Sequence, residues 1–282
     1  MSREYRKSPV VMAGITARQL IQILFTATAI VPGYLMITAS LKTQEEFLSH
    51  PWSLPLHPSF AGYKAAWNDQ FPRWFTNSLI VTASSVLLTV AIAAMAAWGF
   101  AHWVWRGRET VLGILVSLMV VPPVVLLIPL FRFGATLGWI STFRILIMIY
   151  VGLMLPFSVY LLTNFFKAIP TSIIEAAEID GASDLRTFRS IVLPLSGPPL
   201  ITLTVVNLLW AWNELLLALV FLQSDEKKTL MVGITGFQNR YSLSIPTIMA
   251  GMTIATVPLL IAYLFGQRYF VAGLTSGSVK GE

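Results

Sequence analysis

The chain has 282 residues, of which 56% are hydrophobic and only 11% are charged, and its formal net charge is +6. Soluble domains carry about 25% charged residues, so this composition argues against a soluble globular protein. Cysteine is absent, which excludes disulfides and thiol nucleophiles. The basic residues are spread over the ends of apolar segments, a distribution that fits anionic lipid headgroups better than nucleic acid.

Apolar segments long enough to cross a bilayer recur along the sequence. A hydrocarbon core needs about 20 apolar residues per helix, and backbone groups in lipid must bond within their own segment. Each run therefore predicts a transmembrane helix, and the chain is expected to be an all-α integral membrane protein. The six predicted spans are residues 20–40, 79–101, 111–130, 143–165, 200–222 and 246–265.

The first span follows a basic segment and ends at Thr38-Ala39-Ser40, which is loosely similar to a signal-peptide cleavage site. Its apolar run is longer than the about 7–15 residues of a signal peptide, so we expect an uncleaved helix. The next loop, 42–73, is rich in proline. Phe60, Tyr63 and Trp67 have helical spacing there, which fits either a short amphipathic helix at the outer interface or a linker with anchoring aromatics. Prolines inside later spans, Pro122 among them, indicate bends.

A polar segment at 167–195 interrupts the apolar pattern. Pro170 is expected to end the preceding span, because proline cannot donate a backbone hydrogen bond. Ser172 and Glu175 have the spacing of a capping box for a short helix. That helix is expected to end near Asp180, with Gly181 in the left-handed conformation that glycine adopts readily.

A second short helix is expected to begin at Ser183 and to end at Pro194. On the first helix, Ala176 and Ala177 fall one turn before Asp180 and Gly181, which predicts a face of small residues that another protein can approach closely. The carboxylates of Glu175, Glu178 and Asp184 are then available to basic groups or to water.

This segment resembles the cytoplasmic coupling loop of the permeases of binding-protein-dependent ABC importers. In that family the loop is a lever held in a cleft of a separate ATPase, so the resemblance implies that this segment couples ATP hydrolysis to movement of the membrane helices. An ordinary amphipathic loop is the alternative. The matching residues are Glu175, Ala176, Ala177, Asp180, Gly181, Ala182, Phe188, Ile191, Leu193 and Pro194.

Further motifs extend the resemblance from Trp74 to the C-terminus and indicate the smaller, six-helix permease of the maltose-type carbohydrate family. The tail departs from that family at Ser278, where alanine is usual. The motifs are Asn77-Ser78-Leu79, Pro122, Ile128-Pro129-Leu130, Leu137-Gly138-Trp139 with Thr142, Trp212-Asn213 and Gly277-Ser278-Val279-Lys280-Gly281.

The resemblance implies a type I ABC importer permease in the bacterial inner membrane. Residues 1–41 would form the cytoplasmic N-terminus and first helix, 42–73 a periplasmic loop, 74–265 the permease core and 266–282 a cytoplasmic tail. A small excess of Lys and Arg on the predicted inner segments agrees with this orientation. The implied partners are a second homologous permease, an ATPase dimer, an extracytoplasmic solute-binding protein and a sugar-type substrate.

The chain lacks the nucleotide-binding pattern G-x-x-x-x-G-K-[ST]. We therefore expect a transport subunit that is not itself an enzyme and binds no cofactor. ATP and Mg are expected in the partner ATPase.

Polar residues in the fifth span are candidates for the substrate path. Asn207, Trp210 and Glu214 fall on one face of a continuous helix, with Asn213 beside them. An amide can bond sugar hydroxyls and an indole can stack on a sugar ring. The alternative is that these groups lock helix against helix, with Glu214 paired to a neighbouring base.

The loop at 223–244 is predicted, from the resemblance, to reach the binding protein. The candidate contacts are Gly233, Gly236, Gln238 and Asn239.

Two other classes remain as rivals. An ion-coupled secondary transporter would need ionisable groups at mid-membrane, and Glu214 is the only acid within a predicted span. A membrane-bound enzyme would need a cluster of catalytic groups, whereas His50, His57 and His102 lack metal-binding spacing.

Overall fold

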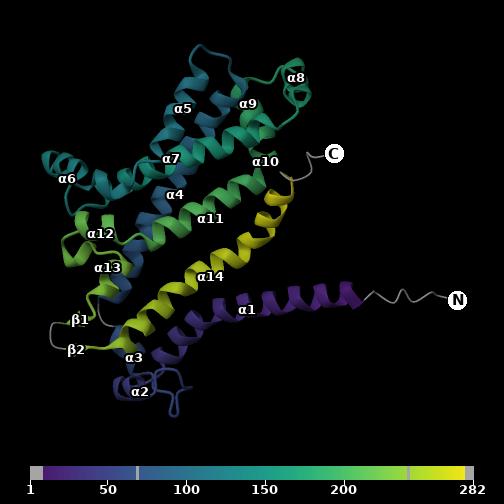
Figure 1. The fold of residues 1–282 in the computed structure, drawn as a ribbon. Helices are drawn as coiled ribbons and strands as arrows, with labels where there is room; N and C mark the ends of the chain where they lie inside the picture. Colours follow the sequence, from purple (N-terminus) through teal and green to yellow (C-terminus); the bar gives the residue numbers. More distant parts are fainter. Residues whose placement is uncertain (1–8, 68–69, 240–241, 277–282) are drawn as a thin grey trace. The chain divides into compact units, whose positions relative to one another are not determined.

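The computed structural model describes residues 9–67, 70–239 and 242–276, and the ribbon is shown in Figure 1. The chain divides into two compact units, each described in turn below. The first comprises residues 1–68 and 237–254, and the second comprises 69–236 and 255–282. The tail motif at 277–281 lies outside the described residues. So do the basic residues among the first eight positions.

The first unit contains α1 (Pro9–Ser40), α2 (Gln44–Ser49), α3 (Ala61–Ala66) and the beginning of α14 (Ile245–Ser276). A short antiparallel pair, β1 (Gln238–Asn239) and β2 (Ser242–Leu243), precedes α14. The expected first span is confirmed at Arg18–Ser40, and no residue of its most apolar window is buried.

Helix α3 is a short helix at the position of the aromatic spacing, which is the first of the two alternatives that the sequence left open. Tyr63 shares a hydrogen bond of 2.8 Å with the hydroxyl of Ser40, at the end of α1. Gly62 lies so close to the carbonyl oxygen of Pro246 that a Cβ would approach it to 2.9 Å. Within this unit, α3 is therefore held against the end of α1 and the start of α14.

Lys42 has a fully buried side chain. Its ammonium group donates to the carbonyl oxygens of His50 and Pro51 at 2.7 and 3.2 Å and to Ser53 Oγ at 3.4 Å. A buried cation needs such partners because desolvation is costly. The lysine thus fixes the turn that follows α2.

The second unit is built on three helices, α4 (Phe71–His102), α7 (Phe143–Lys167) and α11 (Gly197–Asn213). The buried face of α4 carries small and hydroxyl-bearing side chains at helical spacing. Such residues let membrane helices approach closely, since apolar side chains gain little by leaving lipid for one another. They are Ser78, Thr82, Ser85, Thr89, Ala93 and Ala97.

Apolar side chains form two clusters along this bundle. One includes Trp98, Phe166 and Phe188 at the end near α8. The other includes Tyr150, Trp210 and Phe221 at the end near α12. The bundle core therefore extends along the length of α7.

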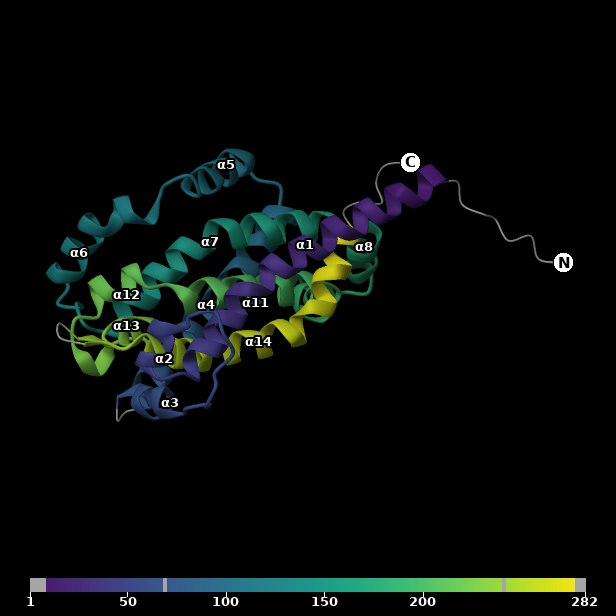
Figure 2. The ribbon, with the colours of Figure 1, turned by 60° about the horizontal axis from the view of Figure 1, so that its bottom comes forward.

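The third predicted span is not one helix. It consists of α5 (Arg108–Leu118), the 3₁₀ turn η1 (Pro123–Leu126) and α6 (Leu127–Thr136), and the two halves are bent by 91°. The predicted bend at Pro122 is confirmed, whereas the prediction of a single helix was wrong, because Pro122 and Pro123 remove two consecutive N–H donors. Figure 2 shows α5 and α6 near opposite ends of α7, so the broken span still runs along the length of that helix.

The fifth predicted span is also interrupted. Helix α11 ends at Asn213, and α12 (Leu216–Phe221) begins after a break at Glu214. On its other side α11 follows α9 (Asp184–Thr187), the π-turn η2 (Phe188–Val192) and α10 (Leu193–Leu195) after a bend of 76°.

Among the described residues, four helices are long and apolar enough to cross a membrane, or up to six if each bent pair is one span. The first, second, fourth and sixth predicted spans are confirmed as α1, α4, α7 and α14.

The segment after α12 contains the turn η3 (Asp225–Lys227) and α13 (Leu230–Thr235). Asn77, near the start of α4, donates to the carbonyl oxygens of Glu226 and Lys228, both at 2.9 Å. Ser78 accepts the N–H of Leu230 at 2.8 Å. The Asn77-Ser78 motif thus ties this segment to α4.

Candidate functional site

The polar segment between α7 and α11 folds into a short helix, α8 (Thr171–Ile179), followed by α9. Its N-cap is Pro170, so the predicted capping box at Ser172 is wrong: Ser172 lies inside the first turn and makes no capping bond. Gly181 has φ +75°, which confirms the predicted left-handed exit. Ser183 occupies the N-cap of α9 but its side chain makes no capping bond either.

The second helix was expected to end at Pro194, and this prediction is wrong. Pro194 lies in the first turn of α10, directly after η2, and the chain turns only at Ser196. The wider π-helical turn, in which the N–H of Leu193 bonds the carbonyl of Phe188, lets the helix continue into a residue without an N–H.

Helix α8 presents a different face from the predicted one. Ile174 and Ala177, three residues apart, are buried, and Ile174 belongs to the cluster around Trp98. Ala177 therefore faces the protein, where it lines a small cavity beside α9. The exposed residues include Glu175, Ala176, Glu178, Asp180 and two isoleucines, Ile173 at 38% and Ile179 at 86% exposure. The sequence interpretation missed Ile179, although an isoleucine among carboxylates in a polar loop was a visible signal.

Phe188 is 7% exposed, so it acts within the chain. Its ring lies between those of Trp98 on α4 and Phe166 on α7, with centroid distances of 5.8 and 6.5 Å. Leu193 packs against the same cluster. These contacts fix the α8–α9 segment to the ends of two membrane helices.

A polar contact reinforces this attachment. The indole N–H of Trp103, just after α4, donates to Asp184 Oδ2 at 3.2 Å, so this carboxylate is engaged within the chain. Nearby, Glu109 on α5 pairs with Arg108 at 2.9 Å and with Lys167 at the end of α7 at 3.4 Å. The ends of α4, α5 and α7 are thereby joined around the base of the segment.

A small cavity of about 200 Å³ with a mixed polar and apolar lining opens between α8 and α9. Asp180, Ala182 and Arg186 line it, together with Thr187, whose hydroxyl is buried and makes no hydrogen bond within the described residues. Ala182 is partly buried here.

Asn207, Trp210 and Glu214 all contact α7, so the predicted shared face exists, but it is turned toward a neighbouring helix of the bundle. Asn207 is buried and donates to Ser158 Oγ on α7 at 3.0 Å, which is the helix-locking alternative. Asn213 is exposed and its amide bonds the carbonyl of Leu209 on its own helix. Trp210 stacks edge-on against Tyr150 at 5.3 Å.

Glu214 is the residue directly after α11, and it still contacts Tyr150 on the same side as Trp210. Its carboxylate accepts the N–H groups of Leu217 and Ala218 at 2.8 and 3.0 Å and the hydroxyl of Tyr150 at 2.7 Å. No basic partner is present among the described residues.

The four candidate contacts in the outer loop differ in their exposure. Gly233 is buried, and a Cβ there would overlap the indole of Trp74, so the predicted contact with a binding protein is wrong for this residue. Gly236 is exposed at the end of α13. Gln238 and Asn239 form β1, and their side chains lie outside the described structure.

Comparison with known proteins agrees with this architecture. Residues 89–276 match the family of binding-protein-dependent transport system inner membrane components. The chain is 38% identical, over 91% of its length and 94% of the relative's, to a putative ABC transporter permease, ORF2, of Caldicellulosiruptor sp.. It is 33% identical to the melibiose/raffinose/stachyose import permease MelC of Bacillus subtilis, over 89% and 91% of the two chains.

It is also 34% identical to the trehalose/maltose permease MalG of Thermococcus litoralis, over 92% and 95% of the chains. Among solved structures, a bacterial ABC transporter for alginate import matches with a TM-score of 0.80 at 23% identity, covering 96% of this chain and 99% of the other. That likeness shows the fold.

The chain belongs to the family of inner membrane components of binding-protein-dependent transport systems, the permease subunits of ABC importers. The predicted all-α permease fold and the transport function are thereby confirmed, as is the expectation that the chain is not an enzyme. ATP is hydrolysed in a separate ATPase subunit. Family membership decides against both the ion-coupled transporter and the membrane-bound enzyme.

Proposed function

We propose that this permease imports a sugar or sugar derivative across the bacterial inner membrane, with both termini in the cytoplasm. It works with a second homologous permease, a solute-binding protein outside and an ATPase dimer that binds ATP and Mg inside. The substrate class is supported by the relatives, whose names include melibiose, raffinose, trehalose, maltose and diacetylchitobiose.

The coupling role of α8 is supported chiefly by one observation: the helix is bound to the membrane helices on one face and uncovered on the other. Ile174 and Phe188 anchor it in the apolar cluster. Glu175, Ala176 and Ile179 remain exposed. Three large apolar side chains, Ile173, Ile179 and Leu185, are exposed in this segment, and a group of exposed apolar residues rimmed by polar ones marks a protein contact. A push on α8 would pass to α4 and α7 through the rings of Trp98 and Phe166.

The test of this role is attachment of the ATPase. Ile179→Asp should release the ATPase from detergent-solubilised importer and abolish ATP-driven uptake, because a charge replaces the apolar contact. Leu56→Asp is the matched control, since Leu56 is 74% exposed in the loop expected on the opposite side of the membrane. Retention of the ATPase by the Ile179 variant would refute α8 as its contact.

The substrate class is tested separately. The cognate solute-binding protein, screened by thermal shift against sugars, polyols and sugar acids, should be stabilised by a saccharide. Proteoliposomes containing the importer should then take up that compound only with ATP inside. Stabilisation solely by non-carbohydrate solutes would contradict a sugar substrate and leave the coupling role intact.

A further inference from the structure

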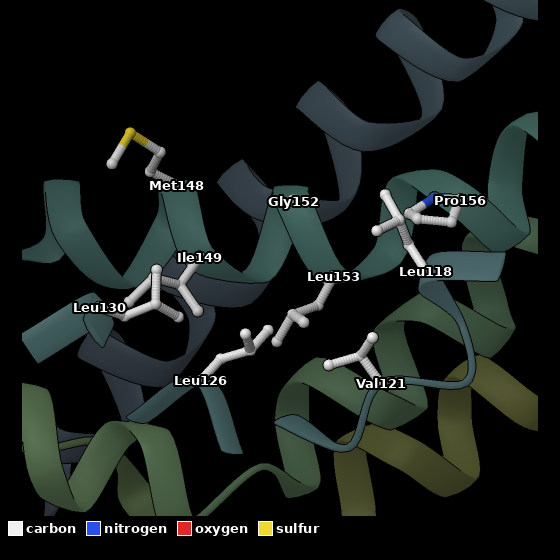
Figure 3. Close-up of a pocket in the computed structure, with 9 residues that line it drawn as sticks. All are labelled: Leu118, Val121, Leu126, Leu130, Met148, Ile149, Gly152, Leu153 and Pro156. Atoms are coloured by element: carbon white, nitrogen blue, oxygen red, sulfur yellow. The ribbon is translucent and has the colours of Figure 1, made fainter. Parts of the chain in front are cut away.

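The loop at 50–60, between α2 and α3, carries large apolar side chains on its outside. In the second unit, Val121 and Leu126 of the broken third span point toward α7 and line an apolar cavity of about 280 Å³ (Figure 3). In the first unit, by contrast, Trp52 and Leu54 of this loop are 69% and 67% exposed. The loop lies outside the predicted spans, so the hydrocarbon core does not by itself account for these two side chains.

The exposed pair lies between two fixed points of the loop. Before it, the fully buried ammonium group of Lys42 donates to the carbonyl oxygens of His50 and Pro51. After it, the N–H of Leu56 donates to Glu46 Oε1 at 2.7 Å. The chain between these points is therefore held in a defined conformation.

A hydrogen bond shows that the loop folds back along α1. The hydroxyl of Tyr34 donates to the carbonyl oxygen of Trp52 at 3.2 Å. Tyr34 is six positions before Ser40, the last residue of α1, which corresponds to about 9 Å along the helix axis. Helical side chains tilt toward the N-terminus, away from that end. The loop thus returns from the end of the span toward the membrane.

The level of Tyr34 corresponds to the boundary between headgroups and hydrocarbon. Glu45 and Glu46 follow in the first turn of α2, which places the end of α1 in the headgroup region. A bilayer is about 40–45 Å thick with its headgroups and about 30 Å without them, so a point about 9 Å inside that end lies near the acyl chains. Tyrosine and tryptophan are enriched at this level, and Tyr34 and Trp52 meet there.

The backbone of the loop suits a poorly hydrated position. Three successive carbonyl oxygens, those of His50, Pro51 and Trp52, accept hydrogen bonds from side chains. Pro51 and Pro55 have no N–H to satisfy. Polar backbone groups need such partners where water is scarce. The irregular backbone nevertheless fits the interface rather than the hydrocarbon core, where lipid-exposed loops do not occur.

Charge and location favour lipid over a protein as the contact of this loop. Residues 50–60 contain no Asp, Glu, Lys or Arg. Helix α1 is itself uncovered, since no residue of its most apolar window is buried, and Val31 and Ile37 on either side of Tyr34 are 43% and 49% exposed. The loop extends this apolar surface. A solute-binding protein would approach from the water beyond the headgroups, whereas the loop is directed back toward the membrane.

We propose that this loop is an interfacial membrane anchor, in which Trp52 and Leu54 insert among the phospholipids beside the end of α1. Leu56 lies next to the Glu46 carboxylate and outside the contact. Apolar groups at such a boundary are buried about 5–10 Å into the headgroup and acyl region. The anchor fixes the depth of this end of the first span. In the orientation proposed above the leaflet is the outer one, but the insertion itself does not depend on that orientation.

Spin labels test the insertion. The chain has no cysteine, so Trp52→Cys and Leu54→Cys can be labelled one at a time in a complete importer whose other subunits carry no accessible cysteine. In nanodiscs each label should collide with lipid-dissolved oxygen and be shielded from a water-soluble nickel chelate. Glu45→Cys, at an exposed residue of α2 in the same unit, is the matched control and should show nickel access.

A second comparison tests the hydrogen bond that holds the loop. Tyr34→Phe removes only the hydroxyl that the carbonyl of Trp52 accepts, so it should raise nickel access at the Leu54→Cys label. Tyr160→Phe, at an exposed tyrosine of α7, is the control and should leave that access unchanged.

Nickel access at either label would mean that the loop is solvated. Shielding from both reagents would mean that a protein covers it, either the second permease or the binding protein. Each of these results overturns the proposal. Unchanged nickel access in Tyr34→Phe would refute the placement of the loop by Tyr34. None of these readouts requires ATP or sugar, so the anchor can fail its test while the proposed import function stands.

Discussion

The hydroxyl of Tyr150, on α7, donates a hydrogen bond to Glu214 at 2.7 Å, and the same carboxylate caps the first turn of α12 through the N–H groups of Leu217 and Ala218. One acidic side chain thus stabilises the break that follows α11 and ties it to a neighbouring helix. The break between α11 and α12 is therefore held by specific hydrogen bonds.

Glu214→Ala should lower the thermal unfolding midpoint of the solubilised importer. Three donors lose their acceptor, and a buried unsatisfied donor costs about 1–3 kcal/mol. Glu214→Gln, which keeps one acceptor oxygen, should cost less. Asn213→Ala serves as the control, since that exposed amide bonds only its own helix. Equal midpoints for Glu214→Ala and the control would show that the carboxylate is not structural.

Asn207 is expected to hold α11 against α7 through Ser158. Asn207→Ala and Ser158→Ala should each destabilise the protein, and the double variant should cost less than their sum. The coupling energy in such a cycle is expected at about 0.6 kcal/mol, the usual value for a hydrogen bond between membrane helices. A change in the sugar preference of uptake with unaltered stability would instead return Asn207 to the substrate path.

Gly233 is expected to tolerate no side chain, because a Cβ would overlap the Trp74 indole. Gly233→Ala should reduce the amount of folded permease in the membrane, measured by fluorescence-detected size exclusion. Trp74→Leu in the same chain should restore part of it. Gly113→Ala is the comparison, at an exposed helical position where a Cβ meets nothing within 4 Å. A fully folded Gly233→Ala would contradict the packing described.

A variant of Phe188 should distinguish binding of the ATPase from the coupling of ATP hydrolysis to transport. Phe188→Ala removes a ring held between Trp98 and Phe166, and truncating a buried phenylalanine costs about 3–5 kcal/mol. The exposed face of α8 is unchanged, so we expect the ATPase to remain bound while ATP hydrolysis no longer drives uptake. The measurement is the ratio of ATP hydrolysed to sugar transported; an unchanged ratio would argue against transmission through this ring.

Local chemistry made much of the fold predictable. Long apolar runs identified α1, α4, α7 and α14, because a helix in lipid must satisfy its own backbone. Pro170 and Gly181 marked the limits of α8, since each acts on the backbone of its own neighbours. The order of residues from Glu175 to Pro194 indicated the permease family.

The breaks within spans and the burial of individual side chains depended on packing between helices. A run of apolar residues such as 111–130 has the same composition whether it is straight or broken. The burial of Ala177, Phe188, Asn207 and Gly233 required the positions of Trp74, Trp98 and Ser158, which lie on other helices. The carboxylate of Glu214 is engaged within the chain because Tyr150 and the N-terminus of α12 offer it three donors.

Periodicity and composition by themselves therefore determined that the chain crosses the membrane, where most of its helices lie and which loop stands apart as polar. Only the tertiary structure decided which side of that loop is free, where two spans break and which polar groups are already engaged. The reason is physical: backbone bonding is settled within a few residues, whereas burial is settled by neighbours distant in the sequence.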